Sequence, residues 1–96
     1  MNYITCTDGT LRCPICGFGY THHGVVNVYN RETEDSEIGI HACVNGTSCN
    51  IDYSMIGNPS RRRDGISIQM RCENGCKFVL HIIQHKGETH LYTISQ

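Results

Sequence analysis

Apolar and polar residues alternate along much of the chain, and short turn signals separate the alternating segments. Asp8-Gly9, Asn45-Gly46, Asn74-Gly75 and Lys86-Gly87 have the composition of tight hairpin turns, because glycine and asparagine tolerate positive φ. No window of about 12 residues carries an apolar stripe at helical spacing. The pattern therefore predicts a mostly β fold, a small antiparallel domain built from several hairpins.

The hairpin centred on Asn45-Gly46 has the clearest pairing pattern. A two-residue loop at that position places alternate residues of the two strands on one apolar face, which we expect to be core. The predicted pairs are Val44 with Thr47, Ala42 with Cys49, Ile40 with Ile51 and Ile38 with Tyr53. The opposite face is mainly polar, and a slip of one residue would mix the two faces, so the register is well specified.

A second hairpin is expected over residues 66–84, turning at Cys72-Glu73-Asn74-Gly75-Cys76. Its predicted pairs also share an apolar face: Met70 with Phe78, Ile68 with Leu80 and Ile66 with Ile82. Further strands are expected at residues 25–29 and 89–94, and a short opening hairpin around Asp8-Gly9 would lead the chain to Cys13. Two segments are expected to be loops, an acidic loop at residues 31–37 and a basic loop at residues 57–65.

Length and composition indicate one domain, residues 1–96, with little core. The apolar share is 39% and tryptophan is absent, so a chain of this size needs a disulfide or a bound metal ion to stabilise its fold. The chain has seven cysteines, no visible signal peptide, and no apolar run near the roughly 20 residues that span a membrane. We therefore expect a cytoplasmic protein without a membrane partner, in which reduced thiols favour zinc over disulfides.

Cys13-Pro14-Ile15-Cys16-Gly17 is the strongest chemical motif in the chain. Two residues between thiolates let both sulfurs bind one ion, and the glycine relieves crowding where the chain reverses. Cys72 and Cys76 flank a turn and can complete a tetrahedral set, so we predict one structural zinc per chain at Cys13, Cys16, Cys72 and Cys76. The alternatives are buried reduced cysteines or a redox pair at Cys13 and Cys16, although such a pair normally opens a helix.

The remaining cysteines and the histidines are weaker candidates for metal binding. Cys43 and Cys49 fall on opposite faces of the first hairpin, so we expect Cys49 in the core, Cys43 partly exposed, and Cys6 in packing. Of His22 and His23, at most one can face the zinc site, where it could replace or support a cysteine ligand; surface packing is the main expectation. We expect His81, opposite Ser67, to be exposed.

The two cysteine pairs resemble the zinc-ribbon class, in which two cysteine turns on β-hairpins clamp one zinc. The chain departs from the usual pattern because three residues separate Cys72 from Cys76, and because a long spacer holds an extra hairpin and two loops. A fuller set of motifs resembles small uncharacterised zinc-ribbon proteins from bacteria and phages. These motifs are Cys-Pro-Ile-Cys-Gly with His22 nearby, Asn58-Pro59-Ser60-Arg61-Arg62, Cys72 to Cys76, and Gln84-His85-Lys86-Gly87. The resemblance implies a zinc-binding fold and supplies no activity.

Arg61, Arg62 and Arg63 form the best candidate for a partner-binding surface, which Lys86 would extend. Guanidinium groups match carboxylates and phosphates, but these arginines could instead balance the acidic loop. Four thiolates leave zinc no open position and no catalytic motif stands out, so we do not expect an enzyme.

The net charge of −1 favours a module that docks a protein, such as a phage or mobile-element factor that modulates a host enzyme. The alternative is a nucleic-acid-binding zinc ribbon that uses the Arg61, Arg62 and Arg63 loop, because a local basic surface can bind phosphates. The sequence leaves the oligomeric state open.

Overall fold

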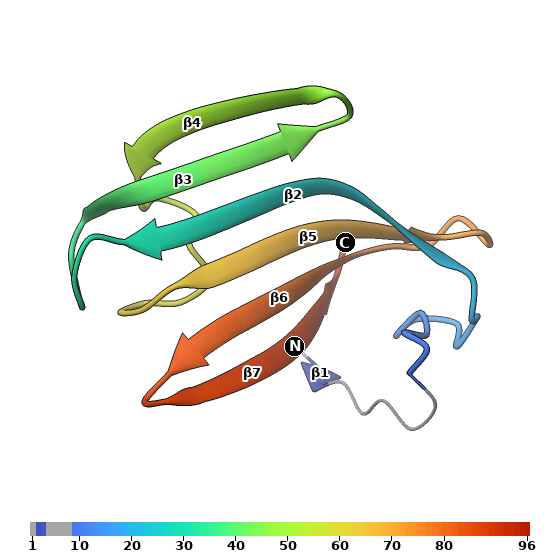
Figure 1. The fold of residues 1–96 in the computed structure, drawn as a ribbon. Helices are drawn as coiled ribbons and strands as arrows, with labels where there is room; N and C mark the ends of the chain where they lie inside the picture. Colours follow the sequence, from blue (N-terminus) through green and yellow to red (C-terminus); the bar gives the residue numbers. More distant parts are fainter. Residues whose placement is uncertain (1, 4–8) are drawn as a thin grey trace.

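The computed structural model describes residues 2–3 and 9–96, which form one antiparallel sheet (Figure 1). Its strands are β1 (Asn2–Tyr3), β2 (Thr21–Arg31), β3 (Ile38–Asn45), β4 (Ser48–Ser54), β5 (Gly65–Cys72), β6 (Lys77–His85) and β7 (Glu88–Ser95). The strand order is β1-β7-β6-β5-β2-β3-β4, so β4 forms one edge. The mostly β, antiparallel fold is confirmed. The described segments contain no helix long and apolar enough to cross a membrane.

The β5–β6 hairpin has the register that its alternation predicts. Met70 pairs with Phe78, and the Ile68–Leu80 and Ile66–Ile82 pairs continue the same face. Phe78 is fully buried and Met70 nearly so, and Ile68 and Leu80 pack against them. The small core therefore lies on this hairpin, at the end of the sheet where β5 stops and β6 begins.

The β3–β4 turn lies one residue further along the chain than predicted. Asn45 pairs with Ser48, so Gly46 and Thr47 are the two loop residues, and the facing pairs become Val44 with Cys49 and Ala42 with Ile51. Gly46 has a φ of 61° and Thr47 has no positive φ, which matches a type II′ turn with glycine at its first central position. The predicted pairs are therefore wrong by two positions, although most of the predicted residues still share the apolar face because side chains alternate with period two. The exceptions are Thr47, which lies in the turn, and Ile38, which a register shift places opposite Ser54.

The apolar face of the β3–β4 hairpin is open to solvent, so the expectation that it is core is wrong. Ile51 is 64% exposed, Tyr53 is 66% exposed, and Cys49 is exposed as well. Alternation defined the apolar face correctly, but among the described residues the segment that precedes β2 packs on β5 and β6 instead. The physical reason is therefore that no second layer formed by residues 9–96 reaches this hairpin.

Strand β2 extends beyond the predicted residues 25–29. It pairs with β3 from Val26 onward and with β5 on the other side, and the pairing with β5 alone carries the strand into the polar residues His22 and His23. A register shift between His23 and Val26 interrupts the pairing with β5. Cys6 and the Asp8 half of the expected opening turn lie outside the described residues.

Candidate metal centre

The first cysteine turn precedes β2. Gly17 donates its backbone N–H to the Cys13 carbonyl at 2.8 Å, and Cys13 donates its own to the Phe18 carbonyl at 2.9 Å. Gly17 has a φ of 78°, a conformation that favours glycine. These two bonds reverse the chain and bring Cys13 and Cys16 to one side of the turn.

The second cysteine turn joins β5 to β6. The Cys72 N–H donates to the Cys76 carbonyl at 2.9 Å, and the Gly75 N–H donates to the Cys72 carbonyl at the same distance. The Glu73 N–H also donates to the Tyr20 carbonyl at 3.1 Å, directly before Thr21 pairs with Cys72 in the sheet. The β2–β5 pairing therefore sets the two cysteine turns beside each other, although they are far apart in the sequence.

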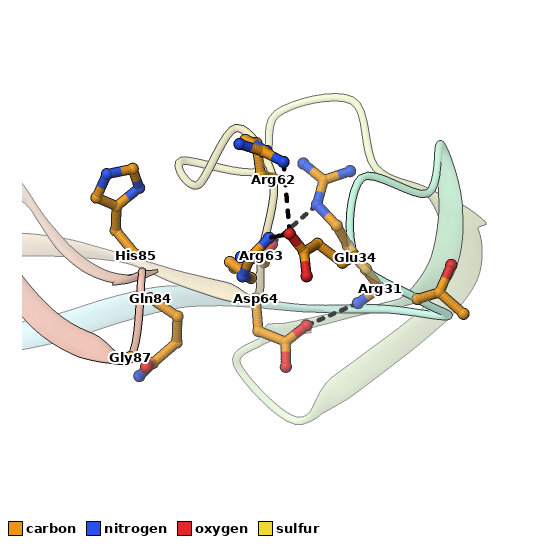
Figure 2. Close-up of a pocket in the computed structure, with 9 residues that line it drawn as sticks. Arg31, Glu34, Arg62, Arg63, Asp64, Gln84, His85 and Gly87 are labelled. Atoms are coloured by element: carbon orange, nitrogen blue, oxygen red, sulfur yellow. Dashed lines mark hydrogen bonds and ion pairs between the residues drawn. The ribbon is translucent and has the colours of Figure 1, made fainter.

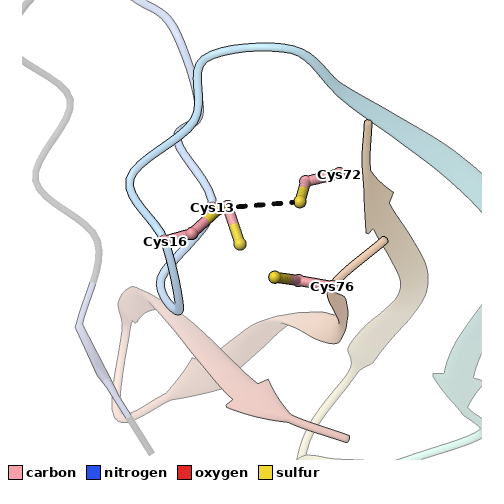
Figure 3. A group of neighbouring side chains, drawn as sticks. All are labelled: Cys13, Cys16, Cys72 and Cys76. Atoms are coloured by element: carbon pink, nitrogen blue, oxygen red, sulfur yellow. Dashed lines mark hydrogen bonds between the residues drawn. The ribbon is translucent and has the colours of Figure 1, made fainter. Parts of the chain in front are cut away.

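The four sulfur atoms converge on one point (Figure 3). All four Sγ atoms lie within 4.8 Å of one another, and Cys16 Sγ is 3.7 Å from Cys72 Sγ. Metal–sulfur bonds of about 2.3 Å in a tetrahedron give sulfur–sulfur edges of about 3.8 Å, whereas a disulfide needs about 2.05 Å. The four cysteines are therefore arranged to hold a metal ion, and no disulfide joins Cys16 to Cys72.

The pKa values of Cys16 and Cys76 are shifted in opposite directions. A backbone hydrogen bond at Phe18 is the largest cause that lowers the pKa of Cys16 to about 7, and the amide of Asn74, 3.7 Å from the sulfur, acts in the same direction. The hydrogen bond with Cys72, followed by burial, raises the pKa of Cys76 to about 12. Without a cation, negative charge at Cys16 thus opposes ionisation of Cys76, and a bound cation would relieve that repulsion.

The cluster is continuous with the small core. Cys13 and Cys72 are 2% and 3% exposed and pack with Met70 and Phe78, whereas Cys16 lies at the surface. A metal bound here would tie the segment before β2 to the β5–β6 turn, on either side of the long spacer.

His22 and His23 are not grouped with the four sulfurs in the described part of the chain. His22 Nε2 lies 2.9 Å from Glu73 Oε2, and both side chains are about half exposed. Because Glu73 sits between Cys72 and Cys76, His22 contacts the second cysteine turn without approaching the cluster.

Cys43 is half-buried, as expected. His81 is also half-buried, where the sequence predicted exposure, because the neighbouring strands β5 and β7 flank it.

The basic and acidic loops contact each other through ion pairs (Figure 2). Arg62 Nε lies 2.6 Å from Asp35 Oδ1, and Arg63 Nη1 lies 2.6 Å from Glu34 Oε1. The hydrogen bond from Arg62 is the largest cause that lowers the pKa of Asp35 below its usual range. Arg62 and Arg63 therefore pair with the acidic loop, which is the alternative to partner binding that the sequence left open.

Arg61 differs from its two neighbours. It is exposed and has no ion pair with any residue that the structure describes. A groove of about 620 Å³ separates this part of the loop from β6 and β7, and its lining includes Arg61, His85, His90 and Tyr92. Lys86 stands next to this groove in the β6–β7 turn, with a φ of 51°. His85 and Glu88, on either side of that turn, line the groove together with Arg61, so the turn lies close to the basic loop. The partner-binding role of Arg61, Arg62, Arg63 and Lys86 stays a prediction.

Arg31 organises both loops, a role that the sequence analysis did not predict. Its guanidinium donates to three backbone carbonyls, those of Arg63 at 2.9 Å, Ser36 at 2.5 Å and Ser60 at 2.8 Å. Its backbone N–H donates to Asp64 Oδ1 at 2.8 Å. Backbone carbonyls accept these bonds, and every residue has one, so the acceptors cannot be recognised in the sequence. Only the position of Arg31 at the end of β2 could have suggested the role.

No protein-family model matches the chain, and neither a curated protein nor a solved structure matches it. The four cysteines and their two turns therefore carry the assignment of a metal centre by themselves. A small all-β fold with such a cluster is compatible with a zinc-binding domain, and membership of the zinc-ribbon class stays a prediction.

Proposed function

We propose that the protein is a binding module stabilised by one structural zinc ion, held by Cys13, Cys16, Cys72 and Cys76. The observation that supports the proposal most strongly is the convergence of four sulfur atoms within 4.8 Å. Four thiolates fill the tetrahedral coordination of Zn²⁺, which leaves no position for a reacting water and supports a structural rather than a catalytic role. Iron also accepts a tetrahedron of thiolates, so elemental analysis must distinguish the two metals.

Zinc would supply much of the folding free energy of this chain. Structural zinc sites in small peptides contribute about 10–16 kcal/mol at neutral pH, which is comparable to the whole net stability of a typical domain. The buried apolar cluster of the described residues consists of Cys13, Met70, Cys72 and Phe78, and two of these are candidate ligands. Metal binding and core formation are therefore expected to occur together.

The proposed docking surface for a protein partner consists of Arg61, Lys86 and the groove beside them. Arg62 and Arg63 add little net charge because Glu34 and Asp35 offset them. A surface with so few unpaired cations suits an acidic protein segment better than a nucleic-acid backbone, which requires many phosphate contacts. A role as a phage or mobile-element factor that acts on a host enzyme in the cytoplasm rests on the family resemblance and on the sequence alone.

The test uses the zinc-loaded protein as bait in an extract of its native host, followed by mass spectrometry of what it retains. The double variant Arg61→Ala and Lys86→Ala should associate with the recovered partner about tenfold more slowly, because rim charges steer encounter. Arg71→Ala is the matched control, since Arg71 is exposed at the opposite end of β5 from the basic loop.

Three outcomes of this comparison are informative. Slower association of the double variant, with normal binding by Arg71→Ala, supports the proposed surface. Equal binding by all three proteins would place the docking surface elsewhere. Recovery of RNA or DNA instead, with affinity that falls steeply as salt rises, would favour the nucleic-acid alternative.

A further inference from the structure

The β3–β4 hairpin presents an apolar face that nothing in the described part of the chain covers. On β3 and β4, alternate residues point to this face, and most of their side chains are exposed. Its members are Ile40, Ala42, Val44, Cys49, Ile51 and Tyr53. At one end, a groove of about 570 Å³ is lined by Ile38, Ile40 and Tyr53. Contiguous exposed apolar surface of this kind marks an interaction site rather than a random scatter of side chains.

Two other parts of the sheet are covered by loop segments. Leu11 and Cys13 pack over the cysteine end of β5 and β6. On the opposite face, the basic loop passes over Tyr29 and Gly65, since a Cβ atom at Gly57 would lie 2.9 Å from Tyr29 Oη. In Figure 1 the β3–β4 hairpin forms the edge of the sheet, with β3 beside β2 and β4 outermost.

Exposed large apolar side chains are concentrated on this hairpin. Among the described residues nine such side chains are exposed, and five of them lie on β3 and β4: Ile38, Ile40, Val44, Ile51 and Tyr53. The core of a dimer interface is apolar in the same way.

The chemistry of the face also fits a second copy of the same chain. Neither β3 nor β4 contributes a charged side chain to it, because Asp52, the single charged residue of β4, lies on the opposite face beside His41 at 3.1 Å. Charge is found only in the lining of the groove at its end, where Arg31 and Glu32 carry opposite signs. A partner must therefore present a neutral apolar surface, and the same face of another molecule does so. A two-fold axis would make the contact self-complementary.

We propose that the protein is a homodimer in which the apolar faces of two β3–β4 hairpins pack against each other. Aligned sheets pack about 10 Å apart with interdigitated side chains, which would bury Ile51 and Tyr53 of both molecules. Pairing of two β4 edges would extend the sheet but would leave these side chains in water, so packing of the faces is favoured over pairing of the edges.

The dimer leaves the Arg61 groove accessible. The groove is lined by Ile83 and His90, and the register across the sheet places Ile83, Gly65, Tyr29 and His41 on the face opposite to the apolar one. The dimer would therefore present two copies of that groove. The proposed interface is separate from the proposed docking surface, so each can fail without the other.

Sedimentation equilibrium of the zinc-loaded protein tests the proposal. The wild-type chain should have twice its mass of 10.8 kDa at micromolar concentration. The double variant Ile51→Glu and Tyr53→Glu should raise the dimer dissociation constant at least about 100-fold, because it places charges at the centre of the interface. Both side chains are exposed in the single chain, so zinc content and far-UV circular dichroism should not change.

Asn50→Glu is the matched control, because Asn50 is exposed on the same strand and points to the other face. It should leave the dimer intact. A wild-type mass of 10.8 kDa at all concentrations up to about 100 µM would overturn the proposal. An unchanged dimer in the double variant, or equal loss of the dimer in Asn50→Glu, would also overturn it, since either result places the contact away from the apolar face.

Discussion

The substitution Arg31→Lys tests how the two charged loops are held together. The three guanidinium nitrogens of Arg31 donate hydrogen bonds to three different backbone carbonyls, those of Ser36, Ser60 and Arg63. The acceptors belong to both loops, so this one side chain connects them. A lysine keeps the positive charge, but its single ammonium group cannot reach three acceptors that diverge around a planar fork.

The expected loss of stability follows from the bonds that lysine cannot replace. If one of the three is retained, two are lost, and a hydrogen bond to a charged group contributes about 1.5–3 kcal/mol. Allowing for the half-buried position of Arg31, we expect the free energy of unfolding to fall by about 2–4 kcal/mol. For a domain of this length that corresponds to a melting temperature lower by about 10 °C or more.

The assay is urea denaturation of the zinc-loaded protein, followed by far-UV circular dichroism. Arg61→Lys is the matched control, because Arg61 is exposed in the same loop region and should change stability by less than about 0.5 kcal/mol. Equal midpoints for the two variants would refute the role of Arg31 as the connection between the loops.

Two further predictions concern the cysteines and the ion pairs. Cys72→Ser should unfold the domain or lower its melting temperature far more than Cys43→Ser, because only Cys72 belongs to the sulfur cluster; equal losses on thermal denaturation would contradict the ligand assignment. The carboxyl of Asp35 should titrate below its usual range in NMR, and Arg62→Ala should raise that pKa toward the ordinary value. Because the pKa of Asp35 is lowered on folding, its contribution to stability is present above the unfolded pKa and is lost as pH falls through the folded one. An Asp35 pKa that is the same in both proteins would show that the ion pair does not form in solution.

The hairpin that carries the second cysteine turn was predictable from the sequence. Its strands alternate cleanly, and Cys72 and Cys76 enclose a turn that contains Gly75, so pattern and turn chemistry select one register. The same features identified the four cysteines as one group before any geometry was known.

Three features could not be predicted from the sequence, each for a different physical reason. Gly46 can occupy either central position of a two-residue turn, so the dipeptide alone did not fix the β3–β4 pairing. Alternation shows which face of a strand is apolar but not whether another layer covers it, which is why Ile51 and Tyr53 were expected inside. The bonds of Arg31 end on backbone carbonyls, which every residue carries.

Metal analysis of the purified protein tests the central claim most directly. Native mass spectrometry combined with elemental analysis should find one zinc ion per chain in the wild-type protein and in Cys43→Ser, and none in Cys72→Ser. This pattern follows from the four sulfur atoms that converge within 4.8 Å, of which Cys72 supplies one and Cys43 none. Wild-type protein without zinc or iron, or Cys72→Ser with its full complement of tightly bound zinc, would contradict the assignment of a four-cysteine structural metal site.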